Sequence, residues 1–224
     1  MSKIYISAGA DDRLIDHLKN AGLQTELIHT EGLVSEPVSD HPDMFMCRLG
    51  IGVDSPLVSY WDTAKSRNES GVSALSPGYP GEVAFNAACT GKYFIHNLKY
   101  TAPQLLDAAR SMGMIEVNVR QGYAKCSTVI VDEDSIITYD RGLGQKCIEA
   151  GMNVLFITPG YVLLEGYESG FLGGASGRIY DTVYFNGDLS GHPDFRAIKE
   201  FIEDRGLRVK WFTEWPLTDI GTIL

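Results

Sequence analysis

Positive charge is scarce in this sequence, and its scarcity limits the possible partners. The 224 residues contain 19 lysines and arginines against 29 aspartates and glutamates, a formal net charge of −10. Binding to a nucleic-acid backbone requires a cationic surface, and the sequence contains no basic run, so we expect no nucleic-acid partner. An acidic protein instead favours small cationic molecules as ligands.

Long hydrophobic runs are also missing. No stretch of about 18 apolar residues occurs, so we expect no membrane-spanning helix, and the first residues lack the apolar centre of a signal peptide. The apolar fraction of 44% and the charged fraction of 21% are ordinary for a globular protein. We therefore expect a cytoplasmic protein that buries a sizeable core.

Cysteine is infrequent, and no two cysteines are close in the sequence. The four are Cys47, Cys89, Cys126 and Cys147, and none belongs to a Cys-x-x-Cys pair. This spacing argues against a disulfide framework or a cysteine zinc site and is typical of reduced thiols in the cytosol. We expect no metal and no cofactor.

One short pattern occurs five times: a helix-like run, a glycine, an apolar residue and a strand-like run. The five glycines are Gly22, Gly71, Gly113, Gly151 and Gly206. Glycine directly after a helix adopts the left-handed cap conformation at little steric cost. The alternating or apolar residues that follow each glycine predict strands.

Two strand-like runs precede the helix in three of these repeats. The predicted elements are 83–88, 92–96 and helix 102–112; 127–131, 135–139 and helix 141–150; and 176–180, 182–186 and helix 193–205. Thr101 is a candidate N-cap of the first of these helices. The predicted unit is strand, strand, helix, strand, and the copy in residues 41–76 is the least regular.

The two ends of the chain complement each other. Residues 3–7 predict a strand that leads directly into a helix near Asp11, without an opening strand, whereas residues 219–224 predict a strand with no helix after it. Pairing the last strand with the first would complete the fifth unit and close a ring of one domain over residues 1–224. The alternative is an ordinary α/β domain whose helix–strand loops use glycine.

The tripeptide His-Pro-Asp occurs at residues 41–43 and 192–194. In the second copy, proline and aspartate suit a helix start, which predicts a structural role for His192. The first copy leads into an apolar, strand-like run. Alternation along a strand would place His41 and Asp43 on one face at one end of the sheet.

Cys126 opens the first strand of the fourth unit, as His41 opens that of the second. In a ring of repeats, equivalent strand starts converge near the axis. Neighbouring Lys125 or an imidazolium would lower the pKa of the thiol and make it nucleophilic. Considered alone, such a cysteine is more often a small buried residue, which is also our interpretation of the other three cysteines.

These features resemble the pentein fold, the α/β propeller of the guanidine-modifying enzymes, which include arginine and agmatine deiminases and amidinotransferases. A non-catalytic ribosome anti-association factor shares that fold. Catalytic members carry a His-x-Asp motif, similar to residues 41–43, and a nucleophilic cysteine two units later, where Cys126 stands. They place an acidic residue beside glycine one unit earlier, similar to residues 219–221. The chain is most similar to a function-unassigned bacterial branch.

The resemblance implies an α/β fold class, a five-fold pseudosymmetric propeller of ββαβ repeats closed by the C-terminal strand. It also implies a cysteine-dependent hydrolase or transferase acting on a small cationic guanidino or amidino molecule. The implied catalytic residues are Cys126, His41 and Asp219, and the implied substrate-binding residues are Asp43, Lys125, Glu165, Gly174 and Asp188. For Asp188, a simple turn before the last helix is the alternative.

Several residues depart from the pattern of that superfamily. Asp219 replaces a Glu-Gly-Gly element, Lys125 stands where some relatives have histidine, and residues 173–177 replace an Arg-Asp pair that clamps guanidinium. Two other functions therefore stay open: a non-catalytic ring that binds a ligand or protein partner, and a metal site of His41, Asp43 and Asp219. A single histidine makes the metal site the weaker of the two. The sequence does not predict the oligomeric state.

Overall fold

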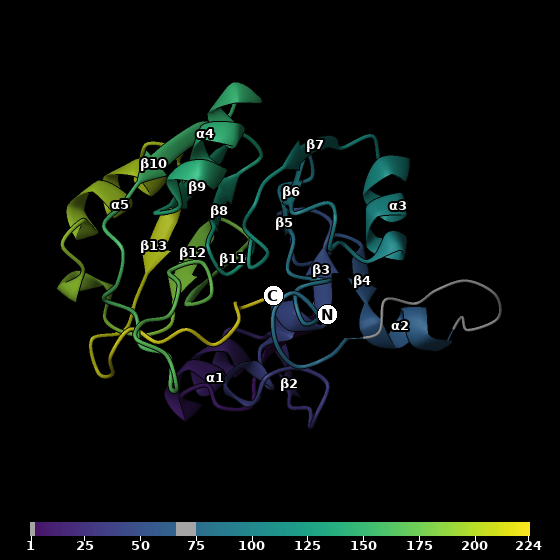
Figure 1. Ribbon diagram of the computed structural model, residues 1–224. Coiled ribbons are helices and arrows are strands. Elements are labelled where there is room, and N and C mark those ends of the chain that lie inside the picture. The colour runs from purple at the N-terminus through teal and green to yellow at the C-terminus, as the bar shows by residue number, and fades with distance from the viewer. Residues whose placement is uncertain (1–2, 66–74) are drawn as a thin grey trace.

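Five small β-sheets and five α-helices make up the part of the chain that the computed structural model describes, residues 3–65 and 75–224. The helices lie on the outside of the molecule, and the strands lie between them (Figure 1). No helix in this part is long and apolar enough to cross a membrane.

The first sheet and its helix form as predicted. β1 (Lys3–Ser7) pairs in parallel with β2 (Gln24–Ile28), and α1 (Asp12–Asn20) connects them. The side chain of Asp11 accepts a hydrogen bond from the main-chain N–H of Arg13 and caps the helix start. Gly22 follows the helix with a φ of 82°, the conformation expected of a glycine cap.

Three further sheets share one pattern: an antiparallel hairpin, then a helix, then a third strand parallel to the second. The first is β5 (Ala88–Cys89), β6 (Tyr93–His96), α3 (Pro103–Ser111) and β7 (Ile115–Asn118). The second is β8 (Val129–Asp132), β9 (Ser135–Thr138), α4 (Arg141–Glu149) and β10 (Asn153–Phe156). The third is β11 (Ser176–Ile179), β12 (Thr182–Phe185), α5 (Phe195–Glu203) and β13 (Arg208–Lys210). The strand, strand, helix, strand order is confirmed for these units, but the predicted strand at residues 83–88 is wrong, because residues 83–87 form a turn and irregular backbone before β5 begins at Ala88.

The second predicted unit differs from its expectation. β3 (Met46–Arg48) pairs antiparallel with β4 (Leu57–Ser59), which leads into α2 (Tyr60–Lys65). The predicted strand start at residues 41–43 is wrong, because the 3₁₀ helix η2 (Pro42–Met44) occupies that place and His41 is its N-cap. Proline suits the first helical position, where no N–H is required. The glycine pattern around Gly71 lies outside the described residues.

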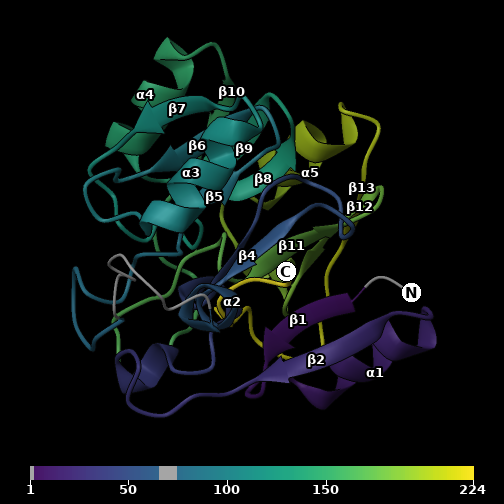
Figure 2. The same ribbon diagram turned by 90° about the vertical axis from the view of Figure 1, so that its right-hand side faces the viewer.

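The predicted closed five-fold propeller is wrong. The five sheets are separate, each with two or three strands, and none of the described strands continues one sheet into the next. Residues 219–224 are not a strand, because Gly221 and Thr222 have φ values of 64° and 76°, which an extended strand does not permit. Two main-chain hydrogen bonds of 2.8 and 3.0 Å between Tyr5 and Leu224 still hold the C-terminal segment beside β1 (Figure 2).

Two predictions about helix starts also required correction. Ala102, not Thr101, is the N-cap of α3, because the Thr101 hydroxyl lies 2.7 Å from Nδ1 of the buried His96. The helix predicted from residue 193 begins at Phe195, after Asp194. His192 is buried, and its Nδ1 accepts a hydrogen bond from the main-chain N–H of Asp194, which agrees with the structural role predicted for it.

The apolar core includes residues of the loops that carry His41 and Cys126. Buried side chains form several clusters, and one of them contains Met44, Phe45, Phe85 and Phe94 together with Cys126. Burying such large side chains is the main stabilising contribution in a domain of this size. The core therefore holds the segments on either side of Cys126 in fixed positions.

Candidate functional site

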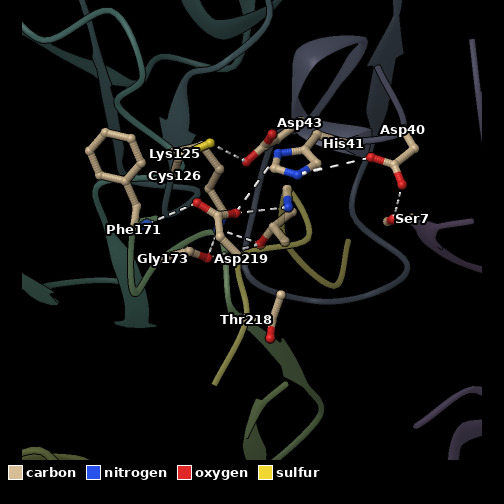
Figure 3. Close-up of polar contacts among 12 residues, drawn as sticks. Ser7, Asp40, His41, Asp43, Lys125, Cys126, Phe171, Gly173, Thr218 and Asp219 are labelled. Carbon is tan, nitrogen blue, oxygen red and sulfur yellow. Dashed lines mark hydrogen bonds and ion pairs between the residues drawn. The ribbon is translucent and has the colours of Figure 1, made fainter. Parts of the chain in front are cut away.

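Three loop segments remote in sequence bring His41, Cys126 and Asp219 together (Figure 3). His41 precedes η2, Cys126 lies in the turn before β8, and Asp219 lies in the segment after β13. One nitrogen of His41, the sulfur of Cys126 and one carboxylate oxygen of Asp219 all lie within 4.8 Å of one another. All three side chains are buried. One atom of a bound molecule could contact all three.

Asn86 positions the cysteine. Its Oδ1 accepts hydrogen bonds from the main-chain N–H groups of Lys125 (2.9 Å) and Cys126 (3.2 Å), and its Nδ2 donates to the Cys126 sulfur at 3.2 Å. Asn86 is fully buried, so these bonds satisfy polar groups that water does not reach. The sequence interpretation missed Asn86, because its local context of small apolar residues contains no signal for this role.

Asp43 contacts the same sulfur. The Cys126 thiol donates a hydrogen bond of 3.0 Å to Asp43 Oδ2. Burial raises the pKa of Cys126 well above its ordinary value, and the negative charges of Asp43 and Asp219 add to this shift. The resting group is therefore the neutral thiol. The sequence-based prediction that neighbouring charge would lower this pKa is wrong for the unliganded site.

Lys125 lies next to the thiol in sequence, but its ammonium is bound elsewhere. Its Nζ donates to Thr222 Oγ1 at 2.6 Å and to the main-chain oxygen of Gly173 at 3.3 Å. Burial lowers the pKa of Lys125, although the nearby carboxylates of Asp43 and Asp219 oppose that shift. Lys125 therefore links two loops behind the site.

Asp43 is also deeply buried. Burial raises the pKa of its carboxyl group, while His41 and Lys125 oppose this shift. Among the described residues, Asp43 Oδ1 has no hydrogen-bond partner. The Asp43 carboxylate, whose pKa is raised, accepts the hydrogen bond of the thiol and is therefore positioned to take up the thiol proton.

Main-chain donors fix the Asp219 carboxylate. Its Oδ1 accepts from the N–H of Gly221 at 3.0 Å, and its Oδ2 accepts from the N–H of Phe171 at 2.9 Å. Oδ1 also lies 3.8 Å from Nδ1 of His41. A Cβ atom at Gly174 would overlap this carboxylate, so the glycine predicted from the loop is required for close approach.

His41 lies between two carboxylates, and neither contact is a hydrogen bond. Its Nδ1 has no hydrogen-bond partner among the described residues, and its Nε2 lies 4.0 Å from Asp40 Oδ1. Asp40 Oδ2 accepts hydrogen bonds from the Ser7 hydroxyl (2.5 Å) and the Gly9 N–H (3.0 Å). The sequence interpretation missed Asp40, although a carboxylate directly before the histidine was a visible signal.

A cavity of about 160 Å³ adjoins the three residues. His41, Cys126 and Asp219 contribute to its lining, and Ser169 is its other polar residue apart from two tyrosines. The remaining lining is apolar or aromatic: Val38, Met44, Tyr123, Leu164, Tyr167 and Phe171. Tyr167 is 49% exposed and Ser169 is exposed, so these residues mark the mouth.

None of the five residues predicted to bind substrate lines this cavity. Glu165 is exposed, although its neighbour Leu164 is part of the cavity wall. The Asp188 side chain caps the 3₁₀ helix η3 (Leu189–Gly191) through the N–H of Ser190, the structural alternative considered for it. Four of the other predicted residues do lie near His41 or Cys126: Asp219, Asp43, Lys125 and Gly174.

The same cluster contains ligand types suited to a soft divalent ion. A histidine nitrogen, a thiolate and a carboxylate are all zinc ligands, and three such ligands would leave one position open. The metal set considered from sequence contained Asp43 in place of Cys126, whereas the geometry selects His41, Cys126 and Asp219. Metal binding would require loss of the thiol proton that Asp43 now accepts as a hydrogen bond.

The electrostatic environment of Cys126 predicts opposite effects of two isosteric substitutions. Asp43→Asn removes a negative charge beside the sulfur, which lowers the free energy of the thiolate. The pH midpoint of Cys126 alkylation by iodoacetamide should therefore fall. Asn86→Asp adds a negative charge and should move the midpoint up. Peptide mass spectrometry across a pH series would follow Cys126 separately from the other cysteines. An unchanged midpoint in Asp43→Asn would contradict this account.

Comparison with known proteins identifies one family. The chain belongs to the family described as "Family of unknown function (DUF6873)", whose model matches residues 5–224. No curated protein and no solved structure matches the chain. The function is therefore inferred from the residues and the geometry of the site.

Proposed function

We propose that the protein is a cysteine-dependent hydrolase or transferase that acts on the carbon of a guanidino or amidino group. The observation that carries the proposal is the convergence of Cys126, His41 and Asp219 within 4.8 Å on the wall of a cavity. A nucleophile, an acid–base group and a carboxylate around one reacting atom are the parts that such a reaction requires. We also propose a relationship to the guanidine-modifying enzymes, on the resemblance of the motifs at residues 41–43 and Cys126.

The charges at the site support a cationic substrate. Asp43 and Asp219 are both buried beside the reacting sulfur, and the chain has a net charge of −10. A planar cation in the cavity would contact the Asp219 carboxylate and lie near Asp43, and both attractions are stronger than at an exposed surface, because the local dielectric is low. Guanidinium and amidinium groups have this charge and shape, and their central carbon is electrophilic.

Substrate binding would activate the thiol. The positive charge of the bound group opposes the negative charges that raise the pKa of Cys126, so the pKa falls when the cavity is occupied. The proton passes from Sγ to Asp43 Oδ2 along the 3.0 Å hydrogen bond. The thiolate attacks the central carbon, and an S–C bond forms as the C=N electron pair moves onto nitrogen.

His41 then acts as acid and base. It donates a proton to the departing nitrogen, the C–N bond breaks, and an S-alkyl thiouronium or thioimidate remains on Cys126. In hydrolysis, His41 removes a proton from water, whose oxygen attacks the same carbon. The S–C bond breaks, the thiolate regains its proton from Asp43, the second proton of the attacking water passes to solvent, and urea or amide leaves. An amine in place of water gives group transfer by the same steps.

A cationic alkylating probe tests this proposal. 2-Chloroacetamidine has an amidinium group, whereas 2-chloroacetamide is its neutral analogue; both form a thioether and release chloride. We expect the amidine to label Cys126 at least about 100-fold faster than the amide at pH 7, because only the cation binds the carboxylates and activates the thiol. Intact mass and peptide mapping give the rate and the position.

Three outcomes separate the alternatives. His41→Ala should reduce the preference for the amidine, since the acid–base partner and part of the cavity wall are lost. Labelling spread over all four cysteines, or equal rates for the two probes, would contradict catalysis and favour a binding protein. Protection by Zn²⁺ that a chelator reverses, with metal in the purified protein, would favour the metal site.

A further inference from the structure

The described residues that line the cavity carry little positive charge. Among the described residues that line it, Asp219 is acidic, His41 is a histidine, and none is lysine or arginine. The nearest cation behind the site, Lys125, already donates to Thr222 and Gly173. A carboxylate taken into this cavity would lose its hydration and face the negative charge of Asp219.

The walls favour an apolar tail. Phe171 stacks on Tyr139 with ring centroids 5.9 Å apart and lies 6.2 Å from the ring of Tyr123. The Tyr123 hydroxyl already donates to Glu82, and burial together with that bond raises the pKa of Tyr123, so this ring is a neutral wall. Aromatic faces attract both planar cations and hydrocarbon groups.

The volume limits the size of the tail. An apolar cavity of about 150 Å³ accommodates benzene, and the cavity beside Cys126 measures about 160 Å³. The guanidinium group of a bound substrate would fill part of this space. The space left accommodates a chain of a few carbons, with a longer substituent passing the mouth at Tyr167, which is 49% exposed.

We propose that the substrate is a monocationic N-alkyl or N-aryl guanidine or amidine without a carboxylate, and that amino-acid guanidines of the arginine type are rejected. This inference rests on the proposed function of Cys126 and names its substrate class. The specificity determinants are the apolar wall that includes Leu164 and Phe171 and, among the described lining residues, the lack of lysine and arginine.

Binding to the full-length Cys126→Ala variant tests the substrate class apart from turnover. N-Butylguanidine and 4-guanidinobutanoate have the same guanidine on a four-carbon chain, which ends in methyl or in carboxylate. By calorimetry, we expect N-butylguanidine to bind at least about 100-fold tighter, because the carboxylate loses its hydration and no lysine or arginine among the described lining residues compensates its charge. L-Arginine should bind as weakly as 4-guanidinobutanoate. Equal or tighter binding of either carboxylate would overturn the proposal.

A cation placed in the wall should weaken the preference for the ligand without a carboxylate. In the Cys126→Ala background, Leu164→Lys supplies a partner for the carboxylate, and we expect 4-guanidinobutanoate to bind at least about 10-fold tighter. Leu163→Lys is the matched control, since Leu163 is 55% exposed and is not part of the lining. An equal gain in both variants would show general electrostatic attraction and overturn the assignment of the wall.

Failure of this inference is distinguishable from failure of the proposed function. If 2-chloroacetamidine labels Cys126 selectively but N-butylguanidine neither binds nor protects against labelling, the substrate class is wrong and the cysteine chemistry stands. If labelling shows no preference for the amidine, the proposed function is wrong, and the substrate class falls with it.

Discussion

In the Cys126→Ala variant, hydrolysis of N-butylguanidine is expected to fall by about 10⁴-fold or more from the wild-type rate. The reason is that the covalent step has no substitute: among the described residues lining the cavity, Cys126 is the one cysteine, and Ser169 at the mouth is exposed. Release of ammonia and of butylamine, each measured separately, covers both directions in which the C–N bonds can break.

Cys147→Ala is the control for the loss of a buried thiol. Cys147 lies on α4, and burial raises its pKa to about 12, so it is not expected to react at neutral pH. Turnover should stay near the wild-type rate in this variant. Residual turnover above about 1% in Cys126→Ala would count against the covalent mechanism, whereas wild-type protein without turnover would count against N-butylguanidine as a substrate.

Substitution of Gly221 by alanine is expected to have a large effect on stability. Gly221 has a φ of 64°, and an added Cβ would overlap the His41 side chain and lie 2.5 Å from His41 Cα. The left-handed backbone costs an L-residue about 1–2 kcal/mol, and displacement of a buried neighbour costs about 1–3 kcal/mol more. The free energy of unfolding should therefore fall by about 3 kcal/mol, and displacement of the histidine should reduce the preference of the labelling for the amidine.

Gly206→Ala separates the two contributions. Gly206 has a φ of 71°, and a Cβ there would meet nothing within 4 Å, so only the backbone cost applies. We expect a loss of about 1 kcal/mol and unchanged labelling. Urea unfolding followed by circular dichroism gives both free energies. Equal losses in the two variants would contradict the close approach of residue 221 to His41.

Local elements of the fold were predictable because their signals are local. The Asp11 cap, the glycine at position 22 and the apolar residues between them are contiguous, and they place α1 to within a residue. At residues 41–43 the apolar run predicted a strand, whereas the chain forms a 3₁₀ turn. Proline disfavours a ladder position and suits such a turn, and the sequence interpretation underestimated that preference.

The closed ring was not predictable from the repeats. A repeated strand, strand, helix, strand pattern sets the pairing within each sheet, because the hairpin and the crossover are local. Whether neighbouring sheets join depends on main-chain conformation at positions such as Gly221 and Thr222, whose positive φ values prevent the expected last strand. The same turn brings Asp219 to His41.

By itself, the sequence determined most of the secondary structure, the character of the core and the residue types available for chemistry. It did so because caps, periodicity and charge act over a few neighbouring positions. Only the tertiary structure decided that the sheets stay separate, that Asn86 and Asp43 hold the Cys126 sulfur, and that the resting thiol is protonated. Burial and the charges of remote segments control the pKa of Cys126, and the residues next to the cysteine in sequence do not predict either of them.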